Sequence, residues 1–161
     1  MDSFKEQLVA RKSDNSVFIK KSCVLIAALF LSAILFILFR YLSFILIAMI
    51  GFGTYYLIKN FDVEYEYICT NGELDVDKII AKSRRKRLTT VDIKGANDFG
   101  RLSEANINKE YSVIDASSGE TENSYYIACK DPKFGMCYVI ISPNEDILEI
   151  IKTYLPRSIR R

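Results

Sequence analysis

The chain has 161 residues, half of them hydrophobic, with 22 basic and 20 acidic side chains. It contains no histidine, which excludes a histidine general base and any metal site that needs a histidine ligand. The hydrophobic residues are concentrated in one segment: 30 of the 37 residues in 22–58 are apolar and Arg40 is the only charge there, whereas residues 59–161 carry 33 charges. This distribution indicates a small integral membrane protein with a charged globular domain.

The apolar segment predicts two transmembrane helices, 22–39 and 41–58, preceded by a cytoplasmic N-terminal tail, 1–21. Each helix would be about 27 Å long, close to the roughly 30 Å of the hydrocarbon core. One continuous helix would be about 55 Å long and would place Arg40 near the middle of the membrane, which is unfavourable. We therefore predict a transmembrane hairpin that turns at residues 39–41.

Basic residues near the ends of the two spans predict the orientation. The tail and Lys59 carry most of these charges, and the turn carries Arg40 alone. Because short cytoplasmic segments are enriched in Lys and Arg, we expect a multi-pass protein of the cell membrane with both termini in the cytoplasm. Aromatic and basic side chains at the two interfaces are expected to anchor the spans, namely Arg40, Tyr41, Tyr55, Tyr56 and Lys59.

Residues 60–161 are predicted to form a cytoplasmic β-domain. Apolar and polar residues alternate from Phe61 to Thr70, as in a half-buried strand. Asn71-Gly72 then predicts a tight hairpin, with a return strand reaching Ile80 and a third strand over about residues 84–93. Residues 94–110 show no pattern that permits an assignment.

Three further β-like runs follow, at 111–116, 125–130 and 136–141. The last element is an amphipathic helix, 143–155, for which Ser142 and Glu145 predict a capping box. Six or seven antiparallel strands followed by one covering helix predict an α+β roll or barrel.

The run from Tyr65 to Asp77, YEYICTNGELDVD, with the basic third strand and the final helix, resembles the bacterial pleckstrin-homology-like (PH-like) domains that follow a two-helix membrane anchor. The chain is also similar to small two-span bacterial membrane proteins. The resemblance covers the anchor and most of the chain after it. It implies a PH-like fold that acts as a binding or scaffolding module.

One dense basic run is a candidate site for anionic lipid, at Lys82, Arg84, Arg85 and Lys86. The alternative interpretation is that the run neutralises the acidic face of the preceding strands, because the expected register sets Arg87 opposite Asp77. Both interpretations remain open. As a hypothesis, Lys82, Arg84 and Arg85 contact lipid while Arg87 is paired within the sheet.

The remaining polar and cysteine clusters do not indicate catalysis. Alternating acidic residues on the first two strands are typical of a solvated face, and the four cysteines are expected to be small buried hydrophobes, with Cys129 and Cys137 facing each other. Nucleic-acid binding is disfavoured because residues 59–161 hold 16 basic and 17 acidic side chains. No catalytic, cofactor or metal motif is present, so we expect no enzyme.

We therefore expect an integral membrane protein whose PH-like domain is a non-enzymatic module that binds a lipid surface, a protein partner or a second copy of the chain. The alternative is an accessory or structural subunit of a membrane transporter or an envelope enzyme complex.

Overall fold

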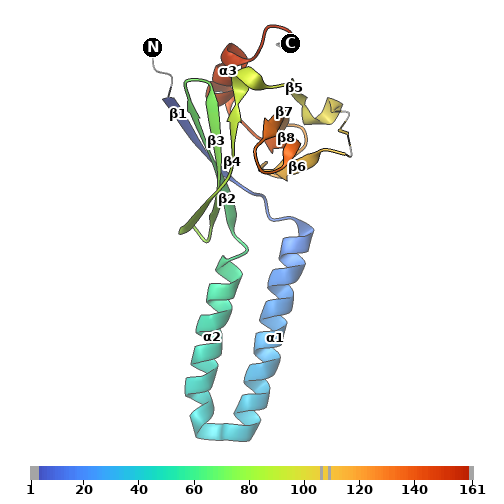
Figure 1. Ribbon diagram of the computed structural model, residues 1–161. Helices are drawn as coiled ribbons and strands as arrows, with labels where there is room; N and C mark the ends of the chain where they lie inside the picture. Colours follow the sequence, from blue (N-terminus) through green and yellow to red (C-terminus); the bar gives the residue numbers. More distant parts are fainter. Residues whose placement is uncertain (1–3, 106, 109, 160–161) are drawn as a thin grey trace. The chain divides into compact units, whose positions relative to one another are not determined.

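The computed structural model describes residues 4–105, 107–108 and 110–159 (Figure 1). It divides into two compact units. The helical unit comprises residues 13–63 and 80–82, and the β unit comprises residues 1–12, 64–79 and 83–161.

The helical unit is a pair of antiparallel helices, α1 (Asn15–Phe39) and α2 (Ser43–Lys59), joined by the 3-10 turn η1 (Arg40–Leu42) (Figure 1). The sequence offered no Gly or Pro for this turn, and Arg40 itself adopts the positive φ of 36° that reverses the chain. The Ser43 hydroxyl donates a hydrogen bond to the Arg40 carbonyl, which holds the start of α2 against the turn.

Helix α1 begins earlier than predicted, at Asn15 instead of residue 22. The Asp14 side chain accepts a hydrogen bond from the Asn15 N–H and caps the helix there. Residues 15–21, which were predicted to belong to the N-terminal tail, therefore form the first two turns of α1. The stretch Asn15–Lys59 is long and apolar enough to cross a membrane, and its most apolar part is not buried in the protein. This is typical of a membrane-associated segment and not of a helix in a soluble core.

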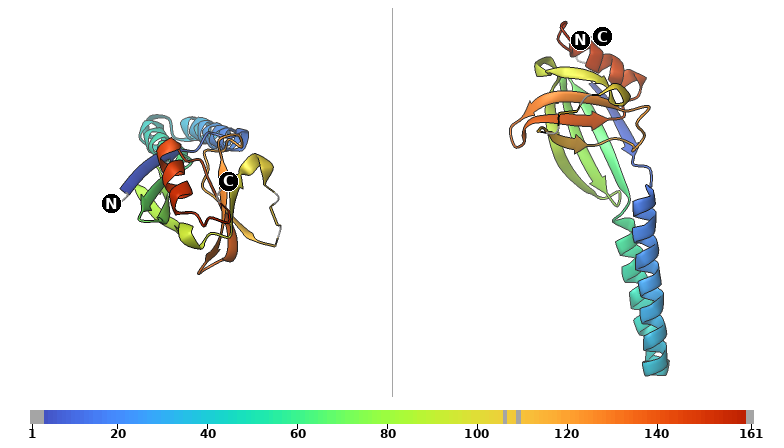
Figure 2. Two further views of the ribbon diagram at one scale, coloured as in Figure 1. Left: turned by 90° about the horizontal axis from the view of Figure 1, so that it is seen from above. Right: turned by 90° about the vertical axis from the view of Figure 1, so that its right-hand side faces the viewer.

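The β unit contains two four-stranded sheets (Figure 2). The first sheet has the order β1 (Phe4–Ala10), β2 (Val63–Thr70), β3 (Glu73–Ile80), β4 (Arg84–Asp92). The second has the order β5 (Asp98–Arg101), β7 (Tyr125–Asp131), β8 (Gly135–Ile141), β6 (Ser112–Asp115). The 3-10 turns η2 (Ile93–Gly95) and η3 (Leu102–Glu104) flank β5, and the chain ends in helix α3 (Glu145–Tyr154).

Strand β1 lies within the segment that was predicted to be an N-terminal tail, residues 1–21. It pairs antiparallel with β2, from Phe4 opposite Thr70 to Ala10 opposite Glu64. The Gln7 amide fixes β1 to the chain before α3: its Nε2 donates to the Ser142 carbonyl at 3.1 Å and its Oε1 accepts from the Asn144 N–H at 2.7 Å. The β-domain therefore needs residues that lie before the helices, and it does not begin at residue 60.

The tight hairpin predicted at Asn71-Gly72 is confirmed, with φ of 51° and 94° at the two turn residues. Gly72 has a second role, because a Cβ there would lie 2.8 Å from the Tyr154 ring. The same turn that joins β2 to β3 is therefore also the surface against which the end of α3 packs.

The second sheet differs from the antiparallel arrangement that was predicted. Strand β6 runs parallel to β8, with Ser112 opposite Cys137 and Asp115 opposite Ile140. The unassigned segment 94–110 supplies the short strand β5, which pairs with β7. The described part of the chain thus has eight strands, whereas six or seven were predicted. The difference arises because β1 and β5 were not recognised as strands from their sequences.

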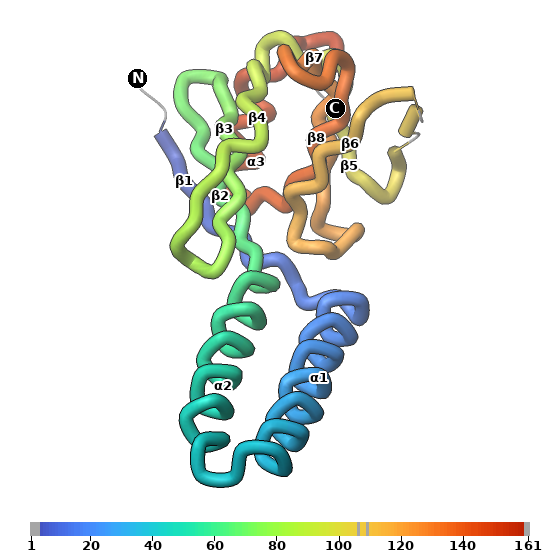
Figure 3. Tube along the Cα trace, turned by 60° about the horizontal axis from the view of Figure 1, so that its bottom comes forward, coloured from blue at the N-terminus to red at the C-terminus, as the bar shows by residue number. Residues whose placement is uncertain are grey.

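Helix α3 covers one end of the space between the two sheets, where it contacts β1 and η2 (Figure 3). Its fully buried side chains are Ile147 and Ile151. The helix is capped by Asn144, whose side chain accepts a hydrogen bond from the Ile147 N–H at 2.9 Å, and not by the predicted Ser142. Ser142 lies two residues before the actual cap, and its hydroxyl instead accepts from the Ser118 N–H at 3.0 Å.

Candidate functional site

The basic run of β4 lies beside acidic residues of the first sheet. Arg87 forms ion pairs with Asp77 and, at 2.7 Å, with Asp75. The predicted pairing of Arg87 with Asp77 is therefore confirmed. Asp77 is buried, so this contact satisfies a carboxylate that would otherwise be costly to enclose.

Arg85 reaches further, across β3, to Glu66 on β2, with its Nη2 2.6 Å from a carboxylate oxygen. Glu66 is only 3% exposed. Burial raises the pKa of Glu66, the Arg85 charge opposes that rise, and the hydrogen bond that protonated Glu66 shares with Glu6 adds to it. Our hypothesis placed Arg85 against lipid, but the structure places its guanidinium on Glu66. Arg85 and Arg87 are thus both paired with carboxylates of the first sheet.

Lys82, Arg84 and Lys86 are exposed. Lys82 belongs to the turn Ile80–Lys82 of the helical unit, in which the Ala81 N–H donates to the Asp62 carbonyl at 3.0 Å. This hydrogen bond holds the turn against the chain that leaves α2. Asp62 also forms an ion pair with Lys21 of α1 at 2.7 Å. Positive charges therefore gather at one end of the helical unit, and we call Lys20, Lys21, Lys59 and Lys82 the cationic collar.

The predicted interfacial anchors lie at the two ends of α2. Arg40 and Tyr41 occupy the turn, and the Tyr41 side chain is 88% exposed. At the other end Tyr55 and Tyr56 are exposed, and the Lys59 ammonium lies 4.6 Å from the centre of the Tyr55 ring. A helix of 17 residues is about 26 Å long, so these side chains are separated by nearly the thickness of the hydrocarbon core.

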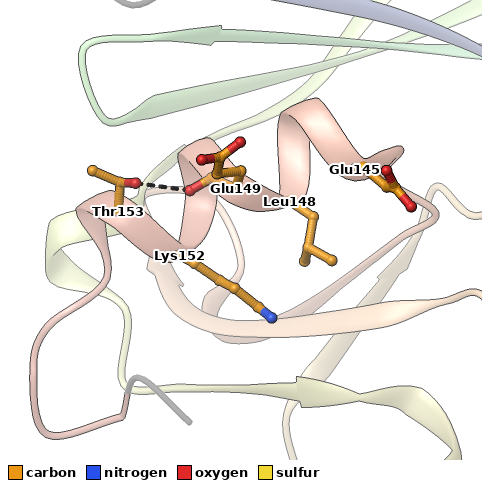
Figure 4. A pocket seen from close by; sticks show the side chains of 5 residues that line it. All are labelled: Glu145, Leu148, Glu149, Lys152 and Thr153. Atoms are coloured by element: carbon orange, nitrogen blue, oxygen red, sulfur yellow. Dashed lines mark hydrogen bonds between the residues drawn. The ribbon is translucent and has the colours of Figure 1, made fainter.

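Helix α3 carries a shallow groove on its outer side (Figure 4). All of its lining residues come from this one helix, namely Glu145, Leu148, Glu149, Lys152 and Thr153. The Thr153 hydroxyl is hydrogen bonded to the Glu149 carbonyl of its own helix at 2.9 Å. Since no second element contributes a polar group, the groove has no converging catalytic groups.

A second hollow of about 230 Å³ lies where Lys152 approaches the edge strand β5. Its floor is aromatic, with the Phe99 and Tyr125 rings stacked 5.6 Å apart. Gly100 also lines this hollow, and it allows the Tyr126 ring to lie close to the backbone of β5, because a Cβ at this position would be only 3.1 Å from that ring.

Three of the four thiols are buried. Cys129 and Cys137 are direct partners across β7 and β8, with their sulfur atoms 3.7 Å apart and unbonded. Burial raises the pKa of Cys69 to about 11 and that of Cys129 to about 12, so neither is an activated nucleophile. Within the described residues, no group of three or more Cys, Asp or Glu is placed to hold a metal ion.

Two sheets with a C-terminal helix that covers one end of them, attached to an apolar helical segment, define a PH-like domain joined to a membrane-associated element. The chain belongs to the family described as Bacterial PH-like domain (DUF6106), whose model matches residues 1–161. The matched region includes β1 and both helices, so the helical unit lies within the region that the family model describes. None of the curated proteins or solved structures compared with the chain matches it.

Proposed function

We propose that the protein is a membrane-anchored, non-enzymatic binding module, whose helices cross the cell membrane twice and whose PH-like domain contacts the anionic cytoplasmic leaflet. The observation that carries this proposal is the register of β1 and β2. These strands flank the helices in the chain and are hydrogen bonded to each other.

The register favours two crossings over one. The chain leaves β1 at Ala10, passes through α1 and α2, and returns to β2 at Glu64, the direct partner of Ala10. A single crossing would put β1 and β2 on opposite sides of the membrane, where they could not pair. Two crossings would keep the paired strands on one side of the membrane, and the single turn at Arg40 between α1 and α2 supports that number.

The charges favour the cytoplasm for both chain ends. The cationic collar lies at the ends of α1 and α2 that the chain joins to β1 and β2, while the turn at the far end of the helical unit carries Arg40 alone. Lys and Arg in short segments near the ends of spans are retained on the cytoplasmic side.

The lipid contact is assigned to the exposed residues Lys82, Arg84 and Lys86, which we call the basic turn. Lys82 is held beside the end of α2 by the hydrogen bond between Ala81 and Asp62. Arg84 follows two residues later, within about 7 Å along the chain. Each Lys or Arg near an anionic surface contributes about 1 kcal/mol of binding free energy. Arg85 and Arg87 are excluded from this contact set because they pair with Glu66, Asp75 and Asp77.

Topology is tested by cysteine labelling of the full chain in intact cells, in a Cys23→Ser background. A membrane-impermeant maleimide should label Arg40→Cys from outside the cell. Ser13→Cys and Ser83→Cys should react only after the membrane is permeabilised. Labelling of Ser13→Cys from outside, or of Arg40→Cys only from inside, would contradict the two-span arrangement.

Lipid contact is tested with the full chain in nanodiscs that contain either zwitterionic lipid alone or added phosphatidylglycerol. A fluorophore on Ser83→Cys should be quenched by headgroup-labelled lipid, more strongly with phosphatidylglycerol and less at high salt. The variant Lys82→Glu/Arg84→Glu/Lys86→Glu should lose this dependence on anionic lipid. The control Lys130→Glu/Lys133→Glu, which changes exposed lysines of the second sheet, should retain it. Quenching that is independent of lipid charge would favour an accessory subunit that binds protein.

A further inference from the structure

The inward face of β3 contains one charged residue. Leu74 and Val76 are fully buried, and the next inward position along the alternation is Lys78. The Lys78 side chain is only partly exposed and lines a pocket of about 490 Å³ at the mouth of the space between the two sheets. A lysine at an apolar position of a strand needs an explanation, because burying its stem costs conformational entropy and partial desolvation.

The pocket is formed by β2, β3 and β4 of the first sheet, by β6 of the second, and by the turn between β7 and β8. Among the described residues after α2, just two large hydrophobic side chains are exposed, Val113 at 49% and Phe134 at 51%. Both line this pocket, together with Leu88. Two such residues, far apart in sequence, thus meet at one opening, which is typical of a surface that covers an apolar ligand.

The charges around the pocket leave one ammonium without a counter-ion. Asp115 is the acid that lines it, and both of its oxygens are engaged: Oδ2 accepts from Arg11 at 3.1 Å, and Oδ1 accepts from the Ser117 hydroxyl at 2.7 Å. Arg11 is further held by the Tyr65 hydroxyl at 2.9 Å. The Lys78 ammonium has no ion pair or hydrogen bond with a side chain or carbonyl of any described residue. The local field therefore favours an anion at Lys78.

We propose that this pocket binds a single-chain amphiphile with a carboxylate head, of the fatty-acid type, with the carboxylate on Lys78 and the alkyl chain against Leu88, Val113 and Phe134. One unpaired cation matches one negative charge, and the hydrophobic side chains beside it match one chain. The volume lies within the range of pockets that hold small ligands. This site does not involve the basic turn, so the proposal stands or falls independently of the lipid contact proposed above.

The test is equilibrium dialysis of radiolabelled octanoate against the full chain in zwitterionic nanodiscs, with empty nanodiscs as the background. Octanoate should bind in excess of that background, and octylammonium, which has the same chain and the opposite charge, should not. Lys78→Gln should weaken octanoate binding about tenfold or more, because it removes a charge-assisted contact. Phe134→Ser should also weaken it, and Phe134 is exposed, so the variant should fold.

Lys130→Gln is the matched control, since Lys130 is an exposed lysine outside both the pocket and the basic run, and this variant should bind octanoate as the parent chain does. Three results would overturn the proposal: no octanoate bound above the background, equal affinity in Lys78→Gln, or equal binding of octylammonium. If a short apolar peptide binds at Lys78 and octanoate does not, the pocket is a protein-docking groove and the assignment to an amphiphile is wrong.

Discussion

Ala10 and Glu64 are direct partners across β1 and β2, although both helices lie between them in the sequence. The helical unit is therefore an insertion between two neighbouring strands of one sheet. Because the ends of the insertion meet, the chain before the helices and the chain after them form a single β unit.

This relationship predicts that the β unit folds without the helices and that it loses stability when β1 is removed. A variant in which a short Gly/Ser linker replaces residues 13–62 should be soluble without detergent and should give the dispersed NMR spectrum of a folded domain. Residues 63–161 alone should be less stable by at least about 3 kcal/mol, because Gln7 and Arg11 each satisfy polar groups of the β unit. Equal stability of the two variants in urea would show that β1 is dispensable.

Stability should depend on pH through Glu66. Its pKa is raised above the ordinary 4.5, mainly by burial, so the folded chain retains a proton where the unfolded chain has lost it. The resulting stabilisation is present below pH 4.5 and is lost as pH rises through the folded pKa. Glu66→Gln should remove this pH-dependent stabilisation, because the amide does not titrate. The parent should therefore lose stability from pH 4 to pH 8 relative to the variant, so the free energy of unfolding of the variant minus that of the parent should increase. Glu73→Gln, at an exposed turn position, is the control. A Glu66→Gln difference that stays constant over this range would contradict the raised pKa.

The buried thiols should be unreactive in the folded protein. With a pKa of about 11, Cys69 has about one thiolate per thousand molecules at pH 8, and Cys129 has fewer. In a Cys23→Ser background, iodoacetamide at pH 8 should leave the native protein unmodified and should add three labels after denaturation, as read by mass spectrometry. Rapid native labelling of Cys129 or Cys137 would mean that the β7–β8 hairpin opens readily.

The cap of α3 distinguishes the observed structure from the predicted capping box. Asn144→Ala should lower the free energy of unfolding by about 1 kcal/mol, and Asn144→Asp should retain the cap. Glu145→Gln should have little effect, since Glu145 follows the cap and does not fold back on it. The urea midpoints of the three variants provide the measurement. A loss in Glu145→Gln as large as that in Asn144→Ala would restore the capping box.

Several features followed from local sequence alone. Asn71-Gly72 predicted the tight hairpin because both residues tolerate positive φ, and the alternation around it predicted β2 and β3. Continuous apolarity predicted the helices, because such a stretch has few alternatives to a helix in lipid. The pairing of Arg87 with Asp77 followed from the hairpin register, which depends on neighbouring residues.

Other features depended on contacts between distant parts of the chain. The partner of β1 lies beyond the helices, so the sequence around β1 contains no neighbouring strand that would indicate pairing. Strand β5 is shorter still and is held by β7. Arg85 was assigned to lipid because the strand pattern shows only direct neighbours, while its long side chain crosses β3 to reach Glu66.

Composition and strand alternation are local properties, and they were enough to separate an apolar helical segment from an α+β domain, to which the resemblance added the PH-like assignment. Tertiary structure alone decided that the two helices interrupt one sheet, and that Lys78, Val113 and Phe134 meet at a single opening. These arrangements arise from strand pairing and sheet packing over long sequence separations, which no local pattern encodes.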